Sequence, residues 1–173
     1  MVNMTRLLFI ILMLILAGFL TGIVLSRAQA IAATEQPIDY SHKTHVQAGI
    51  QCLFCHTSAL RSDIAGIPSV EKCMGCHAII ATSSSNVQLL AGYWERGEPI
   101  PWNRLNKQPD FVYFSHRAHL GAGVNCETCH GDVGLMTVTR PLGQMDMGWC
   151  LDCHFEQPEE QVARLADCLA CHK

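Results

Sequence analysis

The stretch YSHKTHVQAGIQCLFCHTSA, residues 40–59, places three histidines and two cysteines close together in the chain. A second stretch, FSHRAHLGAGVNCETCHGDV at residues 114–133, repeats it at a fixed offset of 74 positions. Both copies hold an aromatic residue, Ser, His, a basic residue and a second His, followed by Gly, two cysteines and a third His. Recurrence in register indicates a duplicated unit whose histidines and cysteines act together.

The ten cysteines of the chain form five C-x-x-C pairs, and a histidine directly follows each pair. C-x-x-C-H is the attachment signature of c-type haem, in which the two thiols hold the haem covalently and the adjacent His binds the iron. A redox-active disulfide or a structural zinc site would account for one or two such pairs. Neither accounts for five pairs with the same trailing His, so the sequence predicts five covalently attached haem c groups.

The predicted attachment residues are Cys52, Cys55, Cys73, Cys76, Cys126, Cys129, Cys150, Cys153, Cys168 and Cys171. The predicted proximal iron ligands are His56, His77, His130, His154 and His172.

The four histidines outside these motifs all lie in the two repeated stretches. They form two H-x-x-H elements, His42 with His45 and His116 with His119, each shortly before a haem motif. A single His is ordinarily solvated or held by a local hydrogen bond, but two pairs in register are typical of distal iron ligands. Because three residues span at most about 10 Å of backbone, one pair must serve two neighbouring irons.

Four distal histidines leave one of five haems without a sixth ligand, and a methionine sulfur is the common alternative in cytochromes c. Met136, Met145 and Met147 are the candidates, with core packing as the alternative role of each. Met147 is favoured because Gly148 beside it lets the backbone approach a ring face. We expect Met147 to serve the haem at His172.

Composition sets the expected fold class. The net charge of −3 is uninformative, and no basic face or array of stacking side chains indicates nucleic-acid binding. The chain must wrap five large apolar macrocycles, so the haems take the place of a protein core. We expect a mostly irregular fold with short α-helices wrapped around five haems and no substantial sheet. Without haem, the chain is expected to be unfolded outside its N-terminal helix.

The N-terminal stretch LLFIILMLILAGFLTGIVL, residues 7–25, carries no charge and is long enough to cross a bilayer as a helix. The alternative is a cleaved signal peptide, for which AQA at residues 28–30 resembles a cleavage site. Because the apolar run exceeds a usual signal core, we expect one uncleaved transmembrane helix in the cytoplasmic membrane. Bacterial c-haem attachment takes place outside that membrane, so the haem domain is expected on its periplasmic face.

The order of motifs and linkers predicts five segments. They are a transmembrane anchor at 1–27, a tether at 28–39, a dihaem module at 40–80, a connector at 81–113 and a trihaem module at 114–173. The connector has neither Cys nor His, and its VQLLAGYWERG stretch predicts a short helix.

H-x-x-H placed before C-x-x-C-H resembles the class III multihaem cytochromes. One N-terminal helix, five motifs, PWNRLNKQPDFVYFSHRAH at 101–119 and MGWCLDCH at 147–154 are together similar to the pentahaem cytochrome subunit of alternative complex III. In class III cytochromes the first His of a pair serves the haem attached next and the second serves the following haem. The resemblance therefore implies the ligand pairs His42/His56, His45/His77, His116/His130 and His119/His154.

The resemblance implies an electron-transfer subunit of a multisubunit membrane complex that oxidises quinol. Its partners would be the other subunits, an iron–sulfur subunit among them, and a periplasmic acceptor such as a cytochrome c or a copper protein. No catalytic residue is predicted, because a multihaem catalyst needs an open iron position and the ligand set nearly fills all five. The alternatives are a self-sufficient small membrane quinol dehydrogenase of the multihaem type and a structural or storage haem protein.

Overall fold

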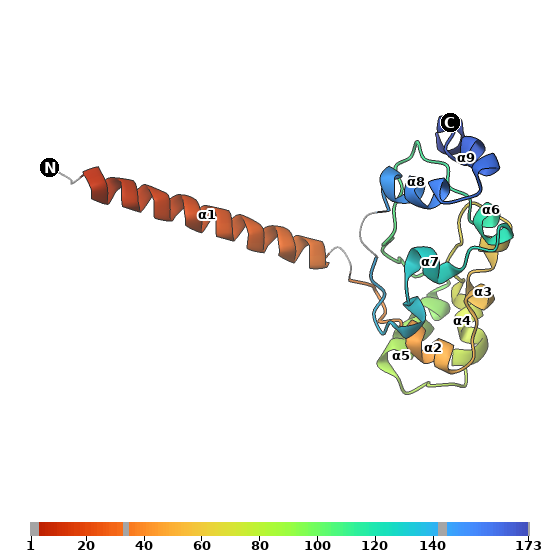
Figure 1. Cartoon of the computed structure of the whole chain (residues 1–173). Helices are drawn as coiled ribbons and strands as arrows, with labels where there is room; N and C mark the ends of the chain where they lie inside the picture. Colours follow the sequence, from red (N-terminus) through yellow and green to blue (C-terminus); the bar gives the residue numbers. More distant parts are fainter. Residues whose placement is uncertain (1–3, 33–34, 142–144, 173) are drawn as a thin grey trace. The chain divides into compact units, whose positions relative to one another are not determined.

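The computed structural model describes residues 4–32, 35–141 and 145–172, and within the first helix it describes the side chains of residue 6 and residues 8–23. The chain divides into two compact units, residues 1–36 and 37–173. The first unit contains one long helix, α1 (Met4–Ala32), which is rich in strong helix formers and contains no proline (Figure 1).

The prediction of a transmembrane anchor is wrong. In the described residues, no helix combines the length and the apolar character that crossing a membrane requires. The predicted single-pass location in the cytoplasmic membrane, with the haem domain on its periplasmic face, is therefore also contradicted.

The second unit consists of short helices joined by irregular segments (Figure 1). These helices are α2 (His42–Gln47), α3 (Cys52–Cys55), η1 (Thr57–Leu60), α4 (Val70–His77), α5 (Ser85–Arg96), α6 (His116–Gly121), α7 (Cys126–His130), η2 (Val133–Leu135), α8 (Met147–Phe155), α9 (Glu159–Leu165) and α10 (Cys168–Cys171). The described residues contain no strand, only an isolated antiparallel bridge between Val112 and His172. The prediction of short helices without a substantial sheet is confirmed for this part of the chain.

Several of these helices begin at a capping side chain. The oxygens of Ser41, Ser69, Asp146 and Asp167 accept hydrogen bonds from backbone N–H groups in the first turns of α2, α4, α8 and α10. Such caps satisfy donors that a helix leaves without an internal partner. Capping matters here because helices this short have little stability of their own.

The two repeated stretches hold each other in place. Helix α2 packs against η2, and α6 packs against η1. The Lys43 N–H donates to the Met136 carbonyl at 3.0 Å, and the Arg117 N–H donates to the Ser62 carbonyl at 3.3 Å. These two bonds correspond at the offset of 74 positions. The duplicated halves are thus reciprocally interleaved, and each one supports the distal-histidine helix of the other.

The protein core is small. The buried apolar side chains of the described residues are Ile38, Ala59, Val87, Leu90 and Ile100, and no large side chain there is fully buried. Helix α5, which the sequence predicts and the structure confirms, supplies two of them and ends at Gly97, whose positive φ of 66° suits glycine. An ordinary hydrophobic core therefore does not account for the order of this unit.

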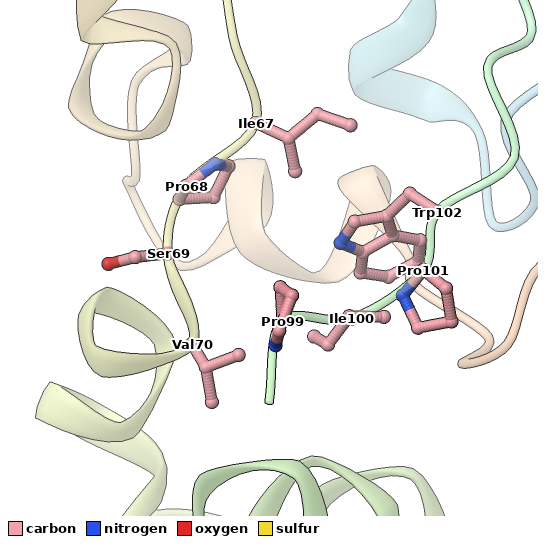
Figure 2. Close-up of a pocket in the computed structure, with 8 residues that line it drawn as sticks. All are labelled: Ile67, Pro68, Ser69, Val70, Pro99, Ile100, Pro101 and Trp102. Atoms are coloured by element: carbon pink, nitrogen blue, oxygen red, sulfur yellow. The ribbon is translucent and has the colours of Figure 1, made fainter. Parts of the chain in front are cut away.

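The largest part of the core lies next to one attachment motif. Ile38, Leu90 and Ile100 form a cluster, against which Cys73, Tyr93 and Trp102 pack among others. Beside it is an apolar cavity of about 400 Å³ (Figure 2). Its lining residues are Ile67, Pro68, Ser69, Val70, Pro99, Ile100, Pro101 and Trp102. The connector thus packs on the α4 motif and borders an apolar space beside it.

Candidate haem centres

All five C-x-x-C pairs lie on short helices or at their ends: α3, α4, α7, α8 and α10. Residues three apart on a helix lie on the same face, so the two thiols of each pair project to one side. The following histidine is the fourth residue after the first cysteine; it lies within α4, α7 and α8, and directly after α3 and α10. Each motif therefore presents two thiols and an imidazole together, as covalent haem attachment requires.

The cysteines are free thiols in the structure, and several are held in the neutral form. Burial is the main cause that raises the pKa of Cys55, Cys73, Cys126, Cys129 and Cys150. A zinc ligand or a redox-active cysteine functions as a thiolate, which a raised pKa disfavours. In the described part of the chain, no three His, Cys, Asp or Glu side chains converge as in a zinc site.

Each of the four H-x-x-H histidines faces a histidine of an attachment motif. The ring centres are 6.4 Å apart for His42/His56, 6.0 Å for His45/His77, 6.3 Å for His116/His130 and 6.1 Å for His119/His154. Two metal–imidazole bonds of about 2.0 Å, with each ring centre about 1.1 Å behind its nitrogen, would separate two ring centres by about 6.2 Å. Every gap thus fits one iron ion.

These four pairs are the ones that the class III resemblance implies, and the structure brings all eight residues into them. Iron ligation by these residues stays a prediction that the geometry supports. The chemistry of the donors also fits, because imidazole is a common axial ligand of haem iron and haem c is held by two cysteine thioether bonds.

Hydrogen bonds leave the other ring nitrogen of these histidines free for a metal. In seven of the nine histidines, Nδ1 lies within bonding distance of a backbone carbonyl: Ser41 for His45 (2.8 Å), Gly66 for His56 (2.6 Å), Ile80 for His77 (3.1 Å), Asp63 for His116 (2.7 Å), Ser115 for His119 (2.8 Å), Leu165 for His154 (2.9 Å) and Phe111 for His172 (3.3 Å). The carbonyl can only accept, so Nδ1 carries the proton and donates. Nε2 is then the metal-binding atom.

Burial also keeps the rings neutral. It lowers the pKa of His42 to about 4, with smaller contributions from His56 and His45. Burial likewise lowers the pKa of His130, and His116 and His56 lower it further. A metal needs the neutral imidazole as its ligand, and the lowered pKa values of His42 and His130 favour that form.

An aromatic residue orients each H-x-x-H pair. The Tyr40 ring lies edge-on to His42 at 4.8 Å and stacks on His45 at 4.5 Å. In the second copy Phe114 makes the same two contacts, again at 4.8 and 4.5 Å. The sequence shows the shared aromatic position, but only the structure shows that it packs against both distal rings. Such packing restricts the ring orientations before any cofactor is present.

Attachment cysteines from different motifs are neighbours. Burial is the main cause that raises the pKa of Cys126, and the nearby Cys52 thiol is the next. Burial is also the main cause that raises the pKa of Cys73, and the nearby Cys55 thiol is the next. One thiol of α3 thus lies near α7 and the other near α4.

The second half of the chain continues this arrangement. Burial is the main cause that raises the pKa of Cys129, and the nearby Cys153 thiol is the next. For Cys150, burial again comes first, and Cys171 is the neighbouring thiol that raises its pKa most. The His154 ring is also held by the Leu165 carbonyl, three residues before α10. The five attachment sites therefore follow one another in the order α4, α3, α7, α8, α10, which differs from their order in the sequence.

The fifth site has no histidine partner of this kind. His172 lies beside Phe111, with ring centres 5.8 Å apart, and its main chain pairs with Val112. Met136 lies at the other end of the row, where its carbonyl binds α2. The Met145 carbonyl accepts from Gln108 at 3.3 Å, and Met147 begins α8 with 65% of its surface exposed. The fifth distal ligand stays a prediction.

Helical C-x-x-C turns beside facing imidazole pairs define a multihaem cytochrome c. Residues 22–99 match the class III cytochrome C family, and residues 112–173 match the family of cytochrome c7 and related cytochrome c. The multiheme cytochrome c subunit of menaquinone reductase from Nitratidesulfovibrio vulgaris is 32% identical over 164 residues, which cover 80% of this chain and 77% of that protein. The chain belongs to the class III and cytochrome c7 type of multihaem cytochromes c.

A second relative is the high-molecular-weight cytochrome c of the same organism. It is 23% identical over 166 residues, which cover 80% of this chain but only 29% of that longer protein. Cytochromes of these families carry covalently bound haem c and transfer electrons, and this chain has the residues for both.

Proposed function

We propose that this chain is a pentahaem electron-transfer subunit of a quinone-linked complex. Its five C-x-x-C-H motifs would each hold one haem c, with the nine histidines and Met147 as axial ligands. The observation that carries the proposal is the set of four imidazole pairs with an iron-sized gap of 6.0–6.4 Å. Haem iron with two strong axial ligands exchanges electrons and has no open position for substrate.

The row of attachment sites supports transfer along the chain. Sites that adjoin each other from α4 to α10 connect one end of the unit to the other, so an electron can enter and leave at different surfaces. The chain itself binds and orients the cofactors: cysteines fix the rings, the paired histidines hold the irons, and the interleaved halves limit their movement. No residue of this chain is assigned a role in breaking or forming bonds of a substrate.

The link to quinone rests on two similarities. One relative is a subunit of a menaquinone reductase by name, and it is similar to this chain over most of its length. The phrases PDFVYFSH and MGWC also resemble the pentahaem subunit of alternative complex III. We propose that the partner subunits, including an iron–sulfur subunit, exchange electrons with quinone, and that a cytochrome c or a copper protein accepts electrons from this chain. A menaquinone-reducing complex, in which electrons flow the other way, is the second candidate.

Quinol reduction with and without partner subunits tests this function. Mixed with quinol alone, the isolated oxidised protein is expected to stay oxidised, because we assign quinol oxidation to the partner subunits. When it is bound to the subunits that copurify with it, quinol is expected to reduce its haems, as followed by the ferrous absorption bands. Rapid reduction of the isolated protein would instead identify a self-sufficient quinol dehydrogenase. No reduction in either case would contradict the quinone link.

A further inference from the structure

The two copies of the repeat differ in what orients the first histidine of H-x-x-H. In the second copy, the His116 Nδ1 atom lies 2.7 Å from the Asp63 carbonyl, in the segment after η1. The residue that corresponds to Asp63 at the offset of 74 positions is Thr137. In the first copy, however, His42 Nδ1 lies 2.9 Å from the side-chain oxygen of Thr139. A hydroxyl here replaces the backbone carbonyl.

This replacement has a chemical consequence. With Nε2 on an iron, the His42 Nδ1 carries a proton and donates it to the Thr139 oxygen. The acceptor of that bond sets how much electron density the imidazole gives the metal, and a stronger acceptor makes a more basic ligand. An amide carbonyl accepts more strongly than an alcohol oxygen. His42 is therefore the weaker donor of the two equivalent histidines.

We propose that Thr139 is a positioning residue that fixes the His42 ring and tunes the potential of the haem held by Cys52 and Cys55. This inference rests on the proposed function, specifically on His42 as an iron ligand. Thr139 and His42 are 97 positions apart and both half-buried, so the second half of the chain sets a property of a site in the first. The matching site in the second half has no side chain in this role.

The test is Thr139→Val in the complete haem-loaded protein, studied by redox titration followed optically and by EPR. Valine keeps the shape of threonine but removes the acceptor. His42 then gives less electron density to the iron, ferric iron is less stabilised, and the potential of one haem rises while the others stay. Thr139→Ser keeps a hydroxyl and is expected to retain the parent potential. Thr137→Val makes the same chemical change at an exposed neighbouring residue and is expected to shift nothing.

EPR separates the haem of the crossed histidine pair from those of the three nearly parallel pairs, His42/His56, His116/His130 and His119/His154. The rings of His42/His56 are nearly parallel, at 11°, whereas those of His45/His77 are at 70°. Parallel imidazoles donate to the same iron d orbital and give rhombic signals, and crossed ones leave two orbitals nearly equal and give a signal with one very large g value. The Thr139→Val change is expected in a rhombic signal and not in the large-g signal.

Three results would overturn the role of Thr139: an unshifted potential, a downward shift, or an equal shift in Thr139→Ser. A His42→Met variant separates this failure from that of the ligand assignment. If His42→Met changes one haem strongly while Thr139→Val changes none, only the positioning role fails. If His42→Met changes no haem, His42 is not a ligand, and both this inference and that part of the proposed function are wrong.

Discussion

Protein made without haem attachment is expected to show no cooperative unfolding transition for residues 37–173. Ordering a backbone costs about 1–2 kcal/mol per residue. A buried aliphatic side chain contributes about 1.5–3 kcal/mol, and only five apolar side chains are buried in the described residues. So small a core can order only a small part of this unit, and the haems must supply the remaining buried apolar surface.

Circular dichroism and amide hydrogen exchange check this expectation. The haem-loaded protein is the reference, and the haem-free protein should lack near-ultraviolet signals and protected amides in the second unit. A second experiment removes one haem at a time, by replacing both cysteines of one motif with serine. Loss of the Cys126/Cys129 attachment, in the middle of the row, should lower the melting temperature more than loss of Cys168/Cys171 at its end. A sharp, native-like melt of haem-free protein would show that the chain has a core of its own.

Replacing Met147 by His is expected to lower the highest reduction potential of the protein and leave the other four steps nearly unchanged. A thioether is a softer donor than imidazole and favours ferrous iron, so a His/Met haem has a higher potential than bis-His haems. The segment that holds His172 through Phe111 also binds the Met145 carbonyl through Gln108. Met145 and Met147 therefore lie on the side of the unit where the fifth ligand is needed.

Redox titration and the near-infrared methionine-to-iron charge-transfer band measure the effect. Met145→Leu is the matched control, because it removes the other nearby sulfur and should leave the band in place. If Met147→His keeps both the highest-potential step and the band, another residue is the ligand. If Met145→Leu abolishes the band instead, the ligand is Met145.

The attachment motifs and the histidine pairs were predictable because their chemistry depends on side-chain type and local spacing. C-x-x-C-H fits on one helical turn, and H-x-x-H keeps two rings within reach of neighbouring sites. The short helices without a sheet follow from the same motifs. Local spacing in the sequence therefore predicts the attachment motifs, the histidine pairs and the short helices that carry them.

The long-range contacts were not predictable. Asp63, Gly66 and Leu165 act through backbone carbonyls, which leave no trace in the residue type. Thr139 resembles any other threonine until the fold brings it to His42. The order of the attachment sites also differs from their order in the chain, because the two halves interleave through α2 with η2 and α6 with η1.

The N-terminal segment shows a different failure. An uncharged apolar run suggested a membrane anchor, but apolar composition by itself does not establish a span. The helix that forms there, α1, extends to Ala32, and no described helix has the properties required to cross a membrane. A prediction based on composition alone was less reliable than one based on the chemistry of specific side chains.

The intact mass of the mature protein, measured under denaturing conditions, tests the central claim most directly. Thioether bonds survive unfolding, so every covalently attached haem adds its mass to the polypeptide. We expect an increment of five haems, because all five C-x-x-C pairs lie on helical turns with a histidine beside them. An increment of four haems or fewer would contradict the pentahaem assignment, and peptide mapping would then identify the motif that carries none.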